Sequence, residues 1–96
     1  MNVKILRYTI PAISGRHEVE MPHGAHILRV RQKPNEWSTI SIWAIVNPEA
    51  NKVMRTFRGI TTDETFEKAE LDEMKYLNTV FPTGNKFALH IFEVLL

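Results

Sequence analysis

Cationic side chains recur at every second position of one stretch, and this spacing is the clearest chemical feature of the chain. Arg29, Arg31 and Lys33 share one face of an expected strand over residues 25–33. Like charges placed so closely repel each other unless an anion neutralises them. Guanidinium groups on a rigid strand suit phosphate recognition, and a tryptophan beside them can stack on a base. The candidate ligand-binding residues are Arg29, Arg31, Lys33, Trp43, Arg55 and Arg58.

Two of these candidates depend on the fold, because Arg55 and Arg58 join the others only if the strand over 52–62 returns to the same sheet. A small anionic nucleotide is the ligand that such a cluster would take. The competing interpretation of each residue is a solvated sheet face on which long side chains cover the core.

Acidic residues are concentrated in a single segment. Residues 63–73 contain six acids and one lysine, a net charge of −5, whereas the whole chain carries +1 and the remainder therefore carries +6. Carboxylates in the first turn stabilise a helix, but those in the last turn do not. The later acids therefore need cations from the same or another copy, or imitate nucleic-acid phosphates towards a partner. The candidate partner-binding residues are Glu67, Glu70, Asp72 and Glu73.

Catalytic and metal-binding patterns are not found in the sequence. The histidines lie on separate expected elements, and there is no glycine-rich phosphate loop or nucleophile elbow. His23 and His26 are three residues apart, but they flank a turn and have no adjacent carboxylate. The chain contains no cysteine, which excludes disulfides and thiolate ligands. We therefore expect no enzymatic activity, no metal site and no cofactor.

The element that positions the rest of the chain is the stretch WSTISIWAIVNP at residues 37–48. Its period of two and its β-branched content predict a strand in the middle of a sheet with both faces covered. Six further strands are expected at residues 3–10, 16–21, 25–33, 52–62, 76–81 and 86–96. Short strands separated by turns predict one all-β domain over residues 1–96, a mostly antiparallel sandwich or barrel, with an α+β fold as the alternative.

Three details of these elements are open to test. Arg16, Glu18 and Glu20 point one way from the second strand, which places it near an edge. Gly59 marks either a bulge or a close backbone approach. Thr61 and Glu64 form a capping-box pattern that predicts an acidic helix of up to three turns within residues 62–75.

The last expected strand, residues 86–96, is apolar on both sides except for His90 and Glu93. Such a strand must be buried inside the domain or against a second copy, so a homo-oligomer is expected. An apolar edge strand can also recruit a partner by strand addition.

A resemblance to a known family rests on six stretches: residues 5–8 (ILRY), 19–28 (VEMPHGAHIL), 43–48 (WAIVNP), 55–58 (RTFR), 76–79 (YLNT) and 90–93 (HIFE). Together they resemble a family of short, uncharacterised proteins of bacteriophages and prophages, known only as a domain of unknown function. Relatives tend to carry a Gly-Thr-Gly-His-type loop after Arg58, whereas this chain continues with Gly59-Ile60-Thr61-Thr62. The resemblance implies a phage accessory protein of the host cytoplasm and supplies no activity.

These observations lead to three functional hypotheses. The first is a non-enzymatic phage accessory protein that binds and blocks or modulates a host component, in host takeover or anti-defence. The alternatives are an oligomeric sponge that sequesters an anionic nucleotide signal, and a structural or assembly protein of the virion. The expected partner is thus a host protein or a small anionic nucleotide.

Two classes of partner are not expected. The net charge is close to zero and no helix is basic, which argues against sequence-specific binding of duplex DNA. No apolar run is long enough to span a bilayer, and the N-terminal residues do not have the pattern of a signal peptide.

Overall fold

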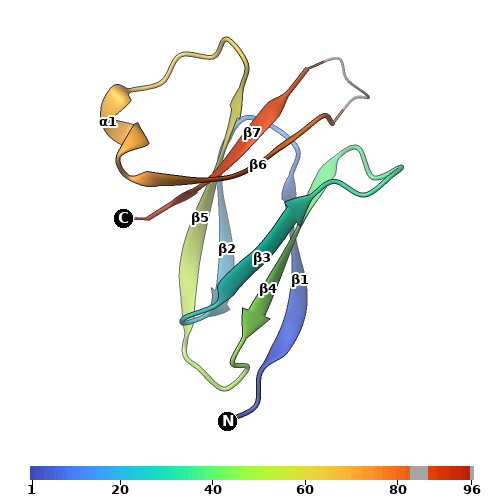
Figure 1. Ribbon diagram of the computed structural model, residues 1–96, viewed down its shortest axis with the longest axis vertical. Coiled ribbons are helices and arrows are strands. Elements are labelled where there is room, and N and C mark those ends of the chain that lie inside the picture. Colours follow the sequence, from blue (N-terminus) through green and yellow to red (C-terminus); the bar gives the residue numbers. More distant parts are fainter. Residues whose placement is uncertain (83–86, 96) are drawn as a thin grey trace.

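The computed structural model of the protein describes residues 1–82 and 87–95, over which the chain forms seven strands and one helical turn (Figure 1). The elements are β1 (Lys4–Pro11), β2 (Gly15–Pro22), β3 (His26–Arg31), β4 (Thr39–Val46), β5 (Lys52–Thr61), α1 (Lys68–Leu71), β6 (Met74–Val80) and β7 (Leu89–Val94). The expected connection around residues 82–85 and the start of the last expected strand lie partly outside the described residues.

The strands form two sheets in which all neighbours are antiparallel. Sheet A has the order β1-β4-β3, and sheet B has the order β2-β5-β7-β6. The two sheets pack face to face as an open sandwich, so the all-β prediction is confirmed and the alternative of a closed barrel is not. The strand within residues 37–48 is central in sheet A, as its alternation predicts.

The core lies between the two sheets and follows from the alternation of each strand. Ile40, Ile42 and Ala44 of β4 have no exposed surface, and Phe57 of β5 and Ile91 of β7 meet them from sheet B in the same cluster. Fully burying an isoleucine or phenylalanine side chain stabilises the fold by about 1.5–3 kcal/mol. The core thus holds the two sheets together, and the side chains on the outer face of each sheet do not take part in it.

Two strands of sheet B occupy the places that their patterns predict. β2 is an edge strand, with Met21 buried and Glu18 and Glu20 exposed. β7 lies between β5 and β6, and Leu89 and Ile91 on its inner face are buried. Both backbone edges of β7 are therefore paired within the chain, and self-association through this strand, which stays a prediction, would have to use its outer face.

The acidic helix is much shorter than predicted. The backbone N–H and Oγ1 of Thr61 both donate to Oε1 of Glu64, but the chain then turns at Asp63, where φ is 73°. A residue in the left-handed region cannot continue a helix. Helical structure is confined to α1, so the carboxylate that was expected to cap a helix closes a turn instead.

Gly59 is a site of close approach and not a bulge. It pairs in unbroken register with Gly15 on one side and Ile91 on the other. A Cβ atom at this position would lie 2.8 Å from the carbonyl oxygen of Ile13. Glycine is needed here because the loop after β1 crosses directly over β5.

Candidate functional site

The outer face of sheet A brings together the residues best suited to binding. In the register of this sheet, Trp43 of β4 lies opposite Arg7 of β1 on one side and opposite Arg29 of β3 on the other. The next row places Arg31 opposite Ser41. A tryptophan thus lies between two arginines on the face that points away from the core.

A bulge in β3 creates this arrangement. Ile27 pairs with the inward-facing Ala44, the register then shifts, and Arg29 pairs with the outward-facing Trp43. In a regular strand Ile27 and Arg29 would share a face, but the register shift between them places them on opposite faces. Bulges re-aim side chains in this way, and here the extra residue, Leu28, is left 47% exposed beside the arginines.

Trp43 and its neighbours line an open hollow of about 520 Å³ on this face. The lining residues are Ile5, Leu28, Arg29, Arg31 and Trp43. Ile5 is 59% exposed, so a strand from each side of β4 contributes an accessible apolar side chain. The hollow is therefore lined by apolar side chains from three strands and by two arginines of β3.

The arginines of this face differ in their partners. Arg7 lies 3.8 Å from a carboxylate oxygen of Glu36 and donates to Oγ of Ser41 at 3.4 Å. Arg29 and Arg31 are exposed, and neither forms an ion pair with any residue that the structure describes. These two side chains can therefore approach a carboxylate or phosphate without first breaking a contact.

The other predicted ligand-binding residues lie elsewhere, and Arg55 and Arg58 do so because β5 joins sheet B and not sheet A. Lys33 is half-buried beyond the end of β3. Arg55 points into the sandwich, where it pairs with Glu93 through two hydrogen bonds, one of 3.0 Å, and donates to the carbonyl oxygen of Ala25 at 2.8 Å. Arg55 is thus engaged within sheet B and is not brought together with Arg29 and Arg31.

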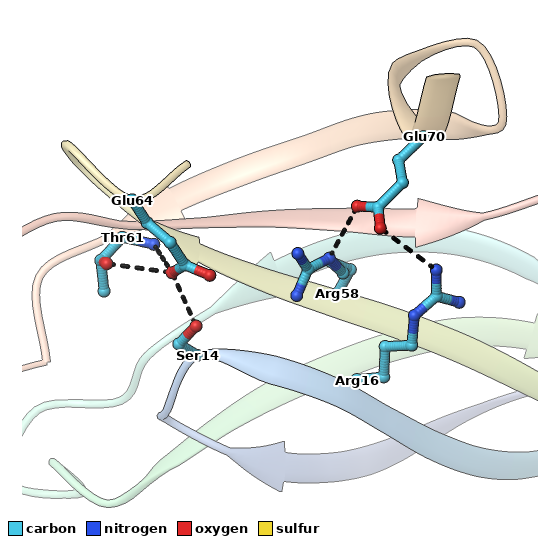
Figure 2. Close-up of polar contacts among 6 residues, drawn as sticks. All are labelled: Ser14, Arg16, Arg58, Thr61, Glu64 and Glu70. Atoms are coloured by element: carbon cyan, nitrogen blue, oxygen red, sulfur yellow. Dashed lines mark hydrogen bonds and ion pairs between the residues drawn. The ribbon is translucent and has the colours of Figure 1, made fainter. Parts of the chain in front are cut away.

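Arg58 is also separated from the cluster, because it faces outward from sheet B. Its Nε donates to the Glu70 carboxylate at 3.3 Å, and the same carboxylate lies 3.9 Å from the Arg16 guanidinium (Figure 2). The cations that neutralise Glu70 therefore belong to β2 and β5 of the same chain. Glu70 is thereby engaged internally, unlike Glu67, Asp72 and Glu73, which are exposed.

A second carboxylate, that of Glu64, fastens the other end of the acidic segment. Ser14 donates to Oε1 of Glu64 at 2.7 Å, and the backbone N–H of Thr61 donates to the same atom at 3.0 Å (Figure 2). These hydrogen bonds lower the pKa of the Glu64 carboxyl below its ordinary value, and the bond from Ser14 has the largest effect. The segment is thus tied to sheet B at both ends.

His90 is the centre of a polar chain on the outer face of sheet B. Its Nε2 lies 2.9 Å from Oγ1 of Thr62, and its Nδ1 lies 2.9 Å from Oγ1 of Thr79, which is 2.7 Å from the Tyr76 hydroxyl. Both ring nitrogens are therefore engaged by hydroxyl groups. No three His, Asp or Glu side chains among the described residues converge as metal ligands.

Sequence reasoning missed Ile5 and Leu28, which line the hollow, and Arg7, which lies opposite Trp43 in the sheet. Ile5 and Arg7 could have been found, since they share one face of the first strand. Leu28 could not, because the alternation places it on the opposite face from Arg29 and only the bulge changes that placement.

In the part of the chain that the structure describes, no helix is long and apolar enough to cross a membrane.

Comparison with known proteins identifies a family for this chain. The model of a family described as a domain of unknown function (DUF7352) matches residues 1–95, nearly the whole chain. No curated protein and no solved structure matches. The chain therefore belongs to the DUF7352 family of proteins with a domain of unknown function.

Proposed function

We propose that this chain is a non-enzymatic binding protein that holds a partner protein on the outer face of sheet A. The observation that supports the proposal is the position of Trp43 between Arg7 and Arg29, beside an apolar hollow. Tryptophan and arginine are the side chains most enriched among residues that dominate binding energy. The preferred partner surface presents an apolar side chain surrounded by carboxylates, which guanidinium groups can hold bidentately.

The finer form of the proposal is a bacteriophage accessory protein that blocks or modulates a host component in the host cytoplasm. Its support is the resemblance of the six stretches to phage and prophage proteins. Membership of the family adds no activity of its own. The host component is defined here by its chemistry, an acidic surface with an apolar protrusion.

The test is quantitative capture of host protein from bacterial lysate on immobilised wild-type protein and variants. The Arg29→Glu/Arg31→Glu protein should lose the captured partner, and Trp43→Ala should weaken its retention roughly tenfold or more. Lys52→Glu/Lys68→Glu is the matched control, because it makes the same change in net charge at exposed positions outside the hollow. Equal losses in both double variants, or unchanged capture by the first, would contradict the proposal.

A second candidate function is sequestration of a small anionic nucleotide. It is favoured by the geometry of Trp43, whose ring offers a stacking surface with guanidinium groups on two sides. Native mass spectrometry of protein purified gently from bacteria would then reveal an added mass of a few hundred daltons. That mass should disappear in Arg29→Glu/Arg31→Glu and persist in Arg58→Gln, since Arg58 lies on the other sheet.

The third hypothesis, a structural or assembly protein of the virion, makes a different prediction. The chain should then be found in purified phage particles in a fixed number of copies. Its absence from particles would leave the two binding functions.

A further inference from the structure

The two outer faces of the sandwich present surfaces of opposite charge. Arg29 and Arg31 are exposed on the outer face of sheet A, without an ion pair to a described residue. The outer face of sheet B carries the acidic segment, because Glu70 is held there by Arg16 and Arg58 (Figure 2). The basic and acidic surfaces of one molecule therefore point away from each other.

The apolar features of the two surfaces are also complementary. The basic face contains the hollow, whose apolar lining residues are Ile5, Leu28 and Trp43. The acidic segment has the opposite shape, a short projection whose helical turn α1 buries no residue. Leu71 of this turn is 49% exposed and is followed at once by the exposed Asp72 and Glu73. An apolar side chain flanked by carboxylates is thus available for an apolar hollow flanked by arginines.

Symmetry decides which contacts between copies are favourable. A two-fold contact of the basic face with itself would bring the exposed arginines of one copy close to those of the other, and a contact between two acidic segments would do the same for carboxylates. Like charges brought together in this way cost several kcal/mol. The attractive contact is the heterologous one, in which different surfaces of two copies meet.

We propose that copies of this chain assemble head to tail, with Leu71 of one copy in the hollow of the next and with Asp72 and Glu73 paired to Arg29 and Arg31. The bonds that fasten Glu64 and Glu70 hold the segment in place before contact, which reduces the conformational entropy lost on association. A heterologous contact closes into a ring or continues as a filament, according to its rotation. This inference goes beyond the proposed function and requires no host partner.

The test uses purified full-length protein, sedimentation velocity and native mass spectrometry at low ionic strength. Wild-type protein should associate at about 0.1 mM, where contacts with a micromolar Kd are saturated. Arg29→Glu/Arg31→Glu and Asp72→Lys/Glu73→Lys should each be monomeric. An equimolar mixture of the two should assemble again, because the unchanged segment of one variant fits the unchanged hollow of the other and the two reversed surfaces also attract each other.

Three further variants sharpen the test. The protein with all four substitutions has both charges reversed and should assemble again. Leu71→Ser leaves every charge in place and should weaken association roughly tenfold or more. Glu18→Lys/Glu20→Lys is the control for Asp72→Lys/Glu73→Lys, since it makes the same charge change at exposed positions of β2 and should assemble like the wild type.

Several results would overturn the inference. They are a monomeric wild type at 0.1 mM, association of either double variant on its own, or a mixture of the two that stays monomeric. Asp72→Lys/Glu73→Lys separates this inference from the proposed function, because it should abolish assembly while the hollow still captures the host partner. Circular dichroism of each variant confirms that the substitutions, all at exposed positions, leave the sandwich folded.

Discussion

Arg16 of β2 and Arg58 of β5 lie directly opposite each other in the register of sheet B, and the carboxylate of Glu70 binds both (Figure 2). Like charges at opposed positions of neighbouring strands destabilise a sheet. Glu70 removes that repulsion, and in return the two arginines hold a segment whose helical turn buries nothing. One carboxylate therefore stabilises sheet B and fixes the position of the acidic surface.

We predict that Glu70→Gln lowers the free energy of unfolding by about 1–2 kcal/mol, since it removes a charge-assisted bond and leaves two arginines opposed. In double-mutant cycles, the coupling of Glu70 to Arg58 should exceed its coupling to Arg16. The Arg58 side chain is 13% exposed and 3.3 Å away, whereas that of Arg16 is 49% exposed and 3.9 Å away. Urea denaturation of the single and double variants measures both couplings.

The control for that cycle is Glu67→Gln, which removes an exposed carboxylate from the same segment. Its effect on stability should stay within about 0.5 kcal/mol. Equal couplings to the two arginines, or an equal loss in the control, would show that Glu70 acts only through the net charge of the segment.

Stability should depend on pH through Glu64. Its pKa in the folded chain is lowered, chiefly by the hydrogen bond from Ser14 and next by that from the Thr61 N–H. A carboxyl group with a lowered folded pKa stabilises the fold above its unfolded pKa, and this contribution is lost as the pH falls through the folded value. We predict that Ser14→Ala reduces stability at pH 7 and flattens the acid limb of the stability curve.

Thermal melting between pH 3 and pH 7 measures this effect. The Glu64→Gln variant should show the same flattening, and Ser14→Ala should add little to it. A Ser14→Ala protein whose acid limb is as steep as that of the wild type would exclude Glu64 as the titrating group.

The sequence predicts the fold well because its signal is local. The alternation around Trp43 and the polar face of β2 both depend on neighbours two residues apart, and the structure confirms the central and the edge position that they indicate. The helix is mispredicted because its signal was also local. The Thr61 and Glu64 pair does form, but Ser14, fifty residues from Glu64, shares the carboxylate.

Only part of the candidate site can be predicted from the sequence, for a related reason. Arg29, Arg31 and Trp43 do lie together, as their residue types suggest. The assignment of Arg55 and Arg58 depended on which sheet the strand after β4 would join, and no local pattern decides between a hairpin and a crossing to the other sheet. The bulge at Leu28 cannot be predicted from the sequence either, because a strand with one extra residue has the same kinds of residue as a regular strand.

Arg55 and Glu93 are expected to be critical for stability and not for binding. Their side chains are 20% and 8% exposed, and Arg55 also donates to the carbonyl oxygen of Ala25. We predict that Glu93→Ala costs about 3–5 kcal/mol, because it leaves a poorly solvated guanidinium group without its carboxylate. Urea denaturation measures the loss.

The double variant Arg55→Met/Glu93→Leu tests the cause of that loss. It removes both charges, so its cost should fall well below the sum of the single variants. A remaining loss of about 1–3 kcal/mol is expected, since the Ala25 carbonyl loses its donor. Strict additivity of the two single effects would show that the side chains act independently and not as a pair.

Two glycines allow steric crowding to be separated from backbone strain. Gly24 has a φ of 81° with nothing within 4 Å of an added Cβ, whereas Gly59 lies outside the left-handed region and a Cβ there would meet the Ile13 carbonyl oxygen at 2.8 Å. Gly24→Ala should lower the free energy of unfolding by about 1–2 kcal/mol, and Gly24→Asn by less, because asparagine tolerates positive φ.

Gly59→Ala should lower the free energy of unfolding by about 1–3 kcal/mol through crowding, and Gly59→Asn should lower it at least as much, because no choice of φ relieves a clash with backbone. Thermal unfolding of the four proteins measures these costs, and a Gly59→Asn protein more stable than Gly59→Ala would place the constraint at Gly59 in its backbone conformation and not in the crossing of the loop after β1.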